Sequence, residues 1–175
     1  MRFPKWVPGL LAIVTLSVPA GAQDMRIGMV TPPPHQWTRS ANALADRISA
    51  ETEGRIKLAV FPSGQLGNEA QMLQQLETGA LDLAFLTVGE LANRDADFGI
   101  LTAPYLVPDA ESAAKLLEGP TATALQEKLG ALGLKGLGYG MAGMRIVLLS
   151  KPLPEGGNVA GRKIRTVPLA QEMDF

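Results

Sequence analysis

Short apolar runs alternate with amphipathic stretches in the first half of this 175-residue chain, and this alternation restricts its fold more than any other feature. The apolar runs are compatible with β-strands, and the stretches between them have the periodicity of α-helices, with Trp37 on the apolar face of the first. Expected strands cover residues 25–30, 55–61 and 81–86, and expected helices cover residues 37–52 and 68–79. The order β-α-β-α-β predicts an α/β fold with a mainly parallel sheet and right-handed crossovers.

The chain beyond residue 86 predicts further helices and then glycine-rich strands. Asp109 is a suitable N-cap for one helix, and Pro120 suits the first turn of the next, which ends near Gly133. Soon after, glycine occupies alternate positions, which leaves an extended strand with one bare face that another element can approach closely. Further strands are expected over residues 145–150 and 163–167.

The first 22 residues have the layout of a secretory signal peptide. Arg2 and Lys5 form a basic region, an apolar run follows, and Ala20-Gly21-Ala22 is a small-residue cleavage site. The alternative is a membrane anchor, but the apolar run is short for a bilayer span. We therefore expect cleavage after Ala22 and export to the periplasm.

Composition excludes several classes of function. The chain has no cysteine, which removes thiolate chemistry, and its single histidine, His35, makes a histidine metal site or a Ser-His-Asp triad very hard to build. A net charge of −1 gives no indication of nucleic-acid binding. Phosphate-loop, nucleophile-elbow and zinc-protease motifs are absent, and Asp95 and Asp97 are better explained as solvated charges than as an acid–base pair. We expect no enzymatic activity, cofactor or metal.

Two arginines are candidates for binding a carboxylate. Arg145 follows Gly143 and Met144, and Arg165 lies in the segment Lys163-Ile164-Arg165. A guanidinium group is permanently charged, and its planar fork of donors matches the two oxygens of a carboxylate. From the residues alone, a surface or sheet-edge arginine is the simpler interpretation of each.

Seven short segments, in their order and spacing, are together more specific than any one of them. They are residues 54–58 (GRIKL), 61–67 (FPSGQLG), 79–84 (GALDLA), 103–106 (APYL), 143–145 (GMR), 151–152 (KP) and 158–165 (NVAGRKIR). The set resembles the solute-binding proteins of TRAP transporters, the DctP family. The resemblance implies a periplasmic binding protein with two α/β lobes, which close on a ligand and deliver it to a membrane permease driven by an ion gradient.

The resemblance also implies roles for particular residues. Arg165 matches the family's arginine that forms a salt bridge with the ligand carboxylate, and Arg145 matches one that assists it. Loops after the first-lobe strands are expected to add polar contacts, for which the candidates are His35, Asn68 and Thr87. Asn68 is also explained as a helix N-cap paired with Gln71, and His35 as an ordinary loop residue. The expected partners are a small organic acid and the TRAP permease subunits, and we expect a monomer.

The family's architecture divides the chain into a signal peptide (1–22), a nearly complete first α/β lobe (23–133), and crossover strands that begin an incomplete second lobe (134–175). Family members extend well beyond this length, so we expect a fragment of a longer chain or a truncated product with weakened binding. Two alternatives to a transport function stay open, a periplasmic ligand-sensing module and a non-functional remnant. Dicarboxylates, keto acids, sugar acids and aromatic acids all carry the carboxylate that such a site binds.

Overall fold

The computed structural model describes residues 23–144, 146, 148–152 and 157–166. The expected signal peptide and Arg145 lie outside the described residues. Within the described part, no helix is long and apolar enough to cross a bilayer.

A three-stranded parallel sheet organises the first part of the chain. Its strands are β1 (Gln23–Gly28), β2 (Ile56–Phe61) and β3 (Leu83–Ala84), in the spatial order β2-β1-β3. β1 pairs with β2 along its whole length, from Gln23 opposite Ile56 to Gly28 opposite Phe61. The predicted α/β fold with a parallel sheet is therefore confirmed.

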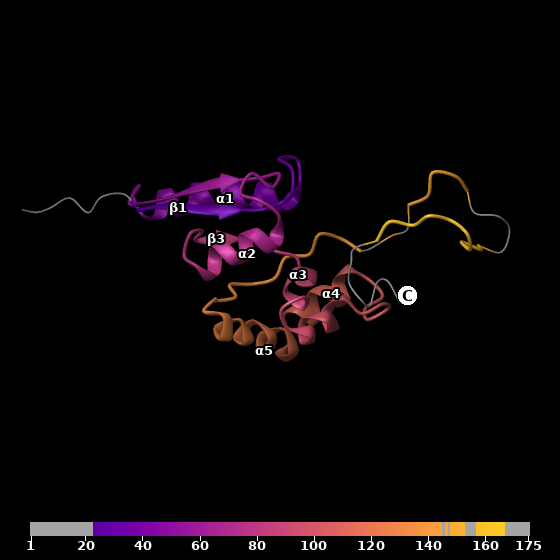
Figure 1. Ribbon diagram of the computed structural model, residues 1–175. Helices are drawn as coiled ribbons and strands as arrows, with labels where there is room; N and C mark the ends of the chain where they lie inside the picture. The colour runs from indigo at the N-terminus through magenta and orange to yellow at the C-terminus, as the bar shows by residue number, and fades with distance from the viewer. Residues whose placement is uncertain (1–22, 145, 147, 153–156, 167–175) are drawn as a thin grey trace, which may run out of the picture.

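Two helices pack against this sheet, α1 (Gln36–Glu51) beside β1 and β2, and α2 (Glu69–Glu77) beside β3 (Figure 1). The α1 side of the sheet holds a buried cluster of four side chains, which are Ile27, Met29, Ala41 and Leu58. Successive strand residues point to opposite faces, so Gly28 turns toward α2. A Cβ at Gly28 would lie 2.7 Å from Met72 Sδ, and the absence of a side chain therefore lets α2 approach β1 closely.

β3 is shorter than the strand expected over residues 81–86. The side chain of Asp82 accepts a hydrogen bond from the backbone N–H of Arg26 at 2.8 Å, and the Arg26 guanidinium donates to the Ala80 carbonyl. A polar side chain thus satisfies the main-chain donor that a longer ladder would use. The ladder with β1 is reduced to Leu83 and Ala84, and the Phe85 N–H ends it by donating to the Gly28 carbonyl at 3.0 Å.

A group of short helices follows the sheet (Figure 1). They are α3 (Val88–Ala92), the 3₁₀ helix η1 (Ala96–Thr102), α4 (Ala110–Leu117), α5 (Pro120–Lys128) and the 3₁₀ helix η2 (Leu129–Leu132). The helices expected after Asp109 and at Pro120 are confirmed, and Gly133 ends the last turn with a φ of 70°. Apolar periodicity did not predict α3 or η1, because each is too short to show it.

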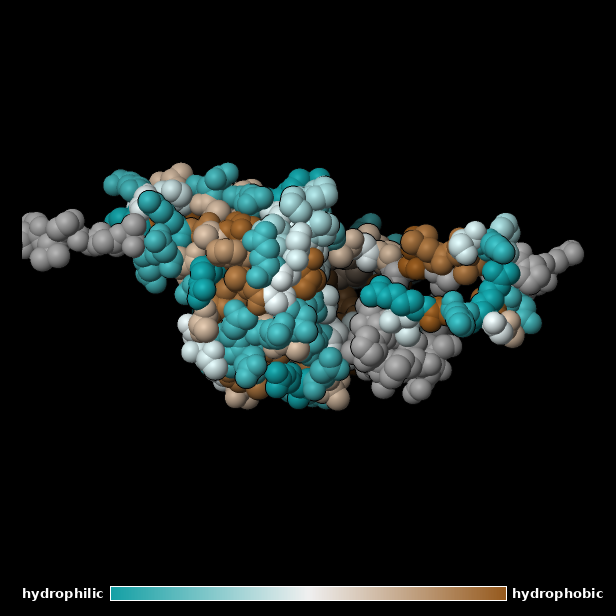
Figure 2. Space-filling view, turned by 45° about the horizontal axis from the view of Figure 1, so that its top comes forward, coloured by the Kyte–Doolittle hydropathy of each residue, from teal (hydrophilic) through white to brown (hydrophobic). Residues whose placement is uncertain are grey.

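The described residues between 134 and 166 form an extended segment without helix or strand. Figure 1 shows its later part, in orange to yellow, running away from the helices. The strands expected over residues 145–150 and 163–167 do not form in the described positions, because no neighbouring strand supplies a hydrogen-bonding partner there. Large apolar side chains are exposed along this segment, including Leu137, Ile146, Leu148 and Ile164. Figure 2 shows brown, hydrophobic surface on the part of the chain that extends from the main body.

Candidate ligand-binding site

The carboxyl ends of the three parallel strands lie at one edge of the sheet. β2 lies on one side of β1 and β3 on the other, so the direction in which strands are added reverses between β1 and β3. In open α/β sheets, ligands bind outside the carboxyl ends of the strands at such a switch point. The loops that follow β1 and β3 therefore frame the candidate site.

Three of the predicted site residues lie at this edge, and each caps a helix. His35 Nδ1 accepts a hydrogen bond from the backbone N–H of Trp37 at 3.1 Å, at the start of α1. Thr87 Oγ1 accepts one from the N–H of Glu90 at 3.3 Å, at the start of α3. The third is Asn68, at the start of α2. Each cap satisfies a helix N–H that has no partner within the helix.

The Asn68 cap is a full capping box, as its spacing predicted. Asn68 Oδ1 accepts from the backbone N–H of Gln71, and Gln71 Oε1 accepts from the backbone N–H of Asn68, both at 2.9 Å. Both side-chain oxygens are thus engaged by the backbone. The cap accounts for the presence of Asn68 without a ligand.

Glu69, which the sequence did not single out, joins two of the site's loops. Its carboxylate accepts hydrogen bonds from Thr87 Oγ1 at 2.5 Å and from the Thr87 backbone N–H at 3.2 Å. The first residue of α2 is thereby tied to the cap of α3, across 18 positions of the chain. This contact fixes the loop that follows β3, since a charged acceptor holds both of its donors strongly.

Three rings form a row across the switch point, and two of them were not predicted as site residues. The rings of Trp37 and Phe85 stack with centroids 5.8 Å apart and an interplanar angle of 22°. His35 also meets Trp37, edge-on and with ring centroids 5.6 Å apart. Phe85 directly follows β3, and an aromatic residue at the carboxyl end of a strand was the signal available in the sequence.

The indole N–H of Trp37 is buried and has no hydrogen-bond partner among the described residues, although the residue as a whole is half-buried. Gly140 lies over this edge of the ring. A Cβ at Gly140 would stand 3.5 Å from Trp37 Nε1 and 4.0 Å from Trp37 Cδ1. The glycine-rich segment therefore approaches the site closely, as the alternating glycines predicted.

The arginines are not brought to this edge within the described residues. Arg165 is exposed, lies in the extended segment, and pairs with no described carboxylate. Arg145 lies outside the described residues. Their assignment to a ligand carboxylate stays a prediction.

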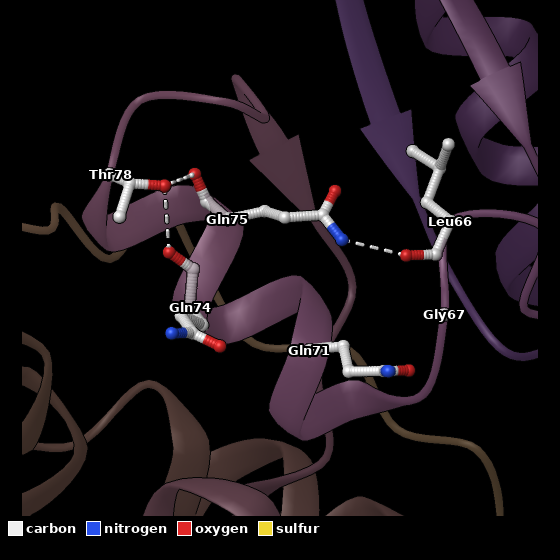
Figure 3. Close-up of a pocket in the computed structure, with 6 residues that line it drawn as sticks. All are labelled: Leu66, Gly67, Gln71, Gln74, Gln75 and Thr78. Atoms are coloured by element: carbon white, nitrogen blue, oxygen red, sulfur yellow. Dashed lines mark hydrogen bonds between the residues drawn. The ribbon is translucent and has the colours of Figure 1, made fainter.

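Two hollows lie in the described surface. One, of about 370 Å³, runs along α2 and is lined by Leu66, Gly67, Gln71, Gln74, Gln75 and Thr78 (Figure 3). Several of its polar groups are bound to the nearby backbone, as when Gln75 Nε2 donates to the Leu66 carbonyl at 2.8 Å and Thr78 Oγ1 to the Gln74 carbonyl at 3.0 Å. The other, of about 530 Å³, lies between η1 and α5. Neither presents a cation to a carboxylate ligand, except for Lys128, which is already paired.

Lys128 joins the two carboxylates that the sequence set aside as solvated charges. Its ammonium group lies 2.8 Å from Asp95 Oδ2 and also contacts the Asp97 carboxylate. The hydrogen bond from Lys128 is the largest cause that lowers the pKa of Asp95, and the same two carboxylates raise the pKa of Lys128. This cluster ties α5 to η1. Among the described residues no group of histidine and acidic side chains is placed to hold a metal ion.

Comparison with known proteins gives one consistent result. The model of the family described as bacterial extracellular solute-binding protein, family 7 (DctP), matches residues 27–173. The 2,3-diketo-L-gulonate-binding periplasmic protein YiaO of Escherichia coli K12 is 31% identical over 167 residues, which are 95% of this chain and 50% of that protein. The sialic acid-binding periplasmic protein SiaP of Vibrio cholerae is 28% identical over 94% of this chain and 53% of its own length.

Solved structures agree with these relatives. The sugar acid binding protein DctPAm from Advenella mimigardefordensis, in complex with galactonate, is 26% identical, with a TM-score of 0.66 over 67% of this chain and 38% of that one. A TRAP periplasmic solute-binding protein from Polaromonas sp. JS666, bound to D-erythronate, is 31% identical, with a TM-score of 0.62 over 66% and 38% of the two chains. The chain spans about half the length of the two curated relatives named above.

Proposed function

Because the chain belongs to the bacterial extracellular solute-binding protein family 7, the DctP family, we propose that it captures a small organic acid and delivers it to a TRAP-type membrane permease. This family consists of solute-binding proteins and not of enzymes. The observation that carries the proposal is the family match over residues 27–173, which includes both the strand edge and the segment that contains Arg165.

The chemistry of the relatives' ligands supports the choice of an acid. The diketogulonate, galactonate and erythronate named for those proteins all carry a carboxylate. A fixed guanidinium fork is the side chain best suited to orient such a group. We assign this role to Arg165, with Arg145 adding positive charge, and assign Thr87, Asn68 and His35 to the facing loops.

In the proposed mechanism, two lobes close on the acid. The row of rings and the capped loops belong to the first lobe, whereas Arg165 belongs to a segment that extends away from it (Figure 1). Hinge closure brings such surfaces together around a ligand and removes water from between them. A carboxylate–arginine pair gains strength when water is removed, because the local dielectric constant falls.

Export to the periplasm by cleavage after Ala22 is part of this proposal. β1 begins at Gln23, directly after the proposed cleavage site. Removal of the preceding segment would therefore leave every strand of the sheet intact. A monomer is sufficient for the mechanism, since both lobes belong to one chain.

The test compares three variants of the full-length gene product, purified from the periplasm with its amino terminus sequenced. Arg165→Ala is expected to weaken binding of the preferred acid about a hundredfold, because it leaves a desolvated carboxylate unpaired. The affinity of Arg165→Lys should lie between those of the original protein and Arg165→Ala, because lysine keeps the charge and loses the planar fork of donors. Arg162, whose guanidinium donates to the Pro152 carbonyl at 3.1 Å, provides the matched control, and Arg162→Ala should bind as the unmodified protein does. Isothermal titration calorimetry against a panel of organic acids measures the affinities.

An Arg165→Ala protein whose affinity stays within about twofold of the original would contradict the role of this residue. Failure of the unmodified protein to bind any acid of the panel would contradict the proposed function itself. Uptake of the acid by vesicles that contain the permease tests delivery, and binding without any uptake would favour a sensing module.

A further inference from the structure

We propose that Trp37 determines ligand specificity, and that its indole N–H donates a hydrogen bond to a hydroxyl oxygen on the carbon chain of the bound acid. The inference deepens the proposed function and rests on it. It names the class of ligand as a hydroxylated carboxylic acid, in preference to an acid with an unsubstituted chain.

The first argument is the unsatisfied donor. Trp37 Nε1 is buried and has no acceptor among the described residues. A buried N–H without a hydrogen-bond acceptor is energetically unfavourable, and a buried indole N–H usually has an acceptor. Trp37 therefore differs from the other candidates of this edge, since His35, Asn68 and Thr87 all accept hydrogen bonds from the backbone.

The second argument is the position of the ring. Trp37 contacts both of the other rings, His35 in the loop after β1 and Phe85 directly after β3, so the rings join the loops on the two sides of the switch point. That is where ligands of open α/β sheets bind. The N–H thus lies where a ligand is expected, and not in a distant part of the core.

The third argument is what covers the N–H. Gly140 is one of its neighbours; it has no side chain, and its segment forms no strand in its described part. Tyr139, the preceding residue, holds this segment through one hydrogen bond from its hydroxyl to the Ala122 carbonyl at 3.0 Å. On the side of Gly140 an oxygen atom beside Nε1 would displace backbone alone, with no side chain to repack.

These features select a hydroxylated chain on chemical grounds. Trp37 and Phe85 are each half-buried, and the ring surface left outside their stack is apolar, which suits C–H groups, whereas the indole edge offers one donor, which requires an oxygen. A carbon chain that carries hydroxyl groups presents both. An unsubstituted chain would cover the N–H and leave it unpaired, and sites with a buried polar group discriminate strongly against such analogues.

The first experiment removes the donor and keeps the ring. In the full-length gene product, Trp37→Phe should bind gluconate, or the tightest-binding hexonate or hexuronate of a panel, about tenfold more weakly than the original protein. Binding of hexanoate, which has the same six carbons and no hydroxyl group, should be equally weak in both proteins. Calorimetry gives the affinities, and thermal unfolding of the ligand-free proteins checks that Trp37→Phe is folded.

A second pair of variants keeps the indole N–H of Trp37 and changes the residue that lies over it. Gly140→Ala places a methyl group 3.5 Å from Trp37 Nε1, in ordinary contact, and should lower affinity for the hydroxylated acid by covering the donor. Gly138→Ala is the matched control, since a Cβ at Gly138 would meet nothing within 4 Å, and it should leave affinity unchanged. In addition, the indole N–H cross-peak that disappears in Trp37→Phe should shift when the hydroxylated acid is added to the original protein.

The outcomes separate this inference from the proposed function. If the original protein binds hydroxylated and unsubstituted acids equally well, or if Trp37→Phe retains full affinity, the specificity role of Trp37 is wrong while acid binding stands. If Arg165→Ala abolishes acid binding while Trp37→Phe and Gly140→Ala keep the original affinity, acid binding is again supported and the specificity role of Trp37 is again wrong. If no acid binds at all, both proposals fail together.

Discussion

The part of the chain from β1 to η2 and the extended segment after it use similar residues with opposite results. In the first part, apolar side chains such as Leu73 and Phe98 are almost fully buried. In the extended segment, Leu148 keeps 84% of its surface exposed, and Ile146 keeps 74%. The apolar content is comparable, so the difference lies in the presence of a neighbouring element to pack against.

The comparison shows which kinds of structure a local sequence can specify. In the first part, α1 to α4 each begin with a side chain that accepts a hydrogen bond from a backbone N–H two or three residues later. A strand lacks such a local solution, because all of its hydrogen bonds go to another strand. The sheet forms where β1 lies between two partners, whereas the described residues of the extended segment form no strand where none lies alongside.

The contrast predicts its largest effect on stability for substitutions in the packed core. Leu73→Ala should lower the free energy of unfolding by about 2–5 kcal/mol, because it removes a fully buried side chain and leaves a cavity. Leu148→Ala, the same change at an exposed position, should stay within about 0.5 kcal/mol of the original protein. Urea unfolding followed by circular dichroism measures both. A large loss for Leu148→Ala would mean that the extended segment is packed.

A smaller effect is expected from two asparagines that make the same kind of contact in the two regions. Asn68 accepts from the Gln71 N–H at 2.9 Å and caps a helix, whereas Asn158 accepts from the Ala160 N–H at 2.8 Å in an exposed turn. Asn68→Ala should cost about 1 kcal/mol of stability, since a helix cap is lost. Asn158→Ala should cost much less, because the turn supports no packed element.

Asn68→Ser provides the control for the first of these variants, since serine is also a good cap and should recover most of the loss. The same urea titrations measure all three proteins. Equal losses for Asn68→Ala and Asn158→Ala would show that the hydrogen bond itself, and not the helix that it begins, accounts for the effect.

Much of the first part was predictable from the sequence, for reasons that individual residues show. Asn68, Asp109 and Pro120 marked helix starts by local chemistry, and the alternating apolar runs identified the strands. Contacts between residues far apart in the chain have no comparable signal in the local sequence. The replacement of strand pairing by the side chain of Asp82 depends on Arg26, 56 positions away, and could not be inferred from either neighbourhood.

The site was predictable to a lesser degree. The loops after the strands were predicted as the edge that holds the site, which stays a prediction, and the contacts of Trp37 and Glu69 arise only when distant elements meet. Trp37 had been assigned to the apolar face of α1, which is correct for its ring and says nothing of its N–H. The stacking of Trp37 on Phe85 and the approach of Gly140 to its N–H depend on the tertiary structure, and the local sequence does not indicate them.

The smallest expected effect is electrostatic, and it sharpens the contrast between tertiary and local contacts. Lys128 joins α5 to η1 by contacting Asp95 and Asp97, whereas Lys115 pairs with Glu111 one turn away on the surface of α4. Lys128→Met should destabilise the protein slightly at neutral pH and low salt, and Lys115→Met should do so even less. Added salt should reduce both differences, because exposed charges are screened.

The pH dependence of this effect follows from the pKa of Asp95, which the hydrogen bond from Lys128 holds below its ordinary value. A carboxyl group with a lowered pKa in the folded state stabilises the protein above its ordinary pKa, and that contribution is lost as the pH falls through the lowered value. The difference in stability between the original protein and Lys128→Met should therefore shrink in acid. Urea unfolding from pH 7 down to about pH 3 measures it, since ordinary aspartate titrates near pH 3.9. A difference that stays constant over this range would mean that Lys128 acts by packing its aliphatic chain and not through the charge on Asp95.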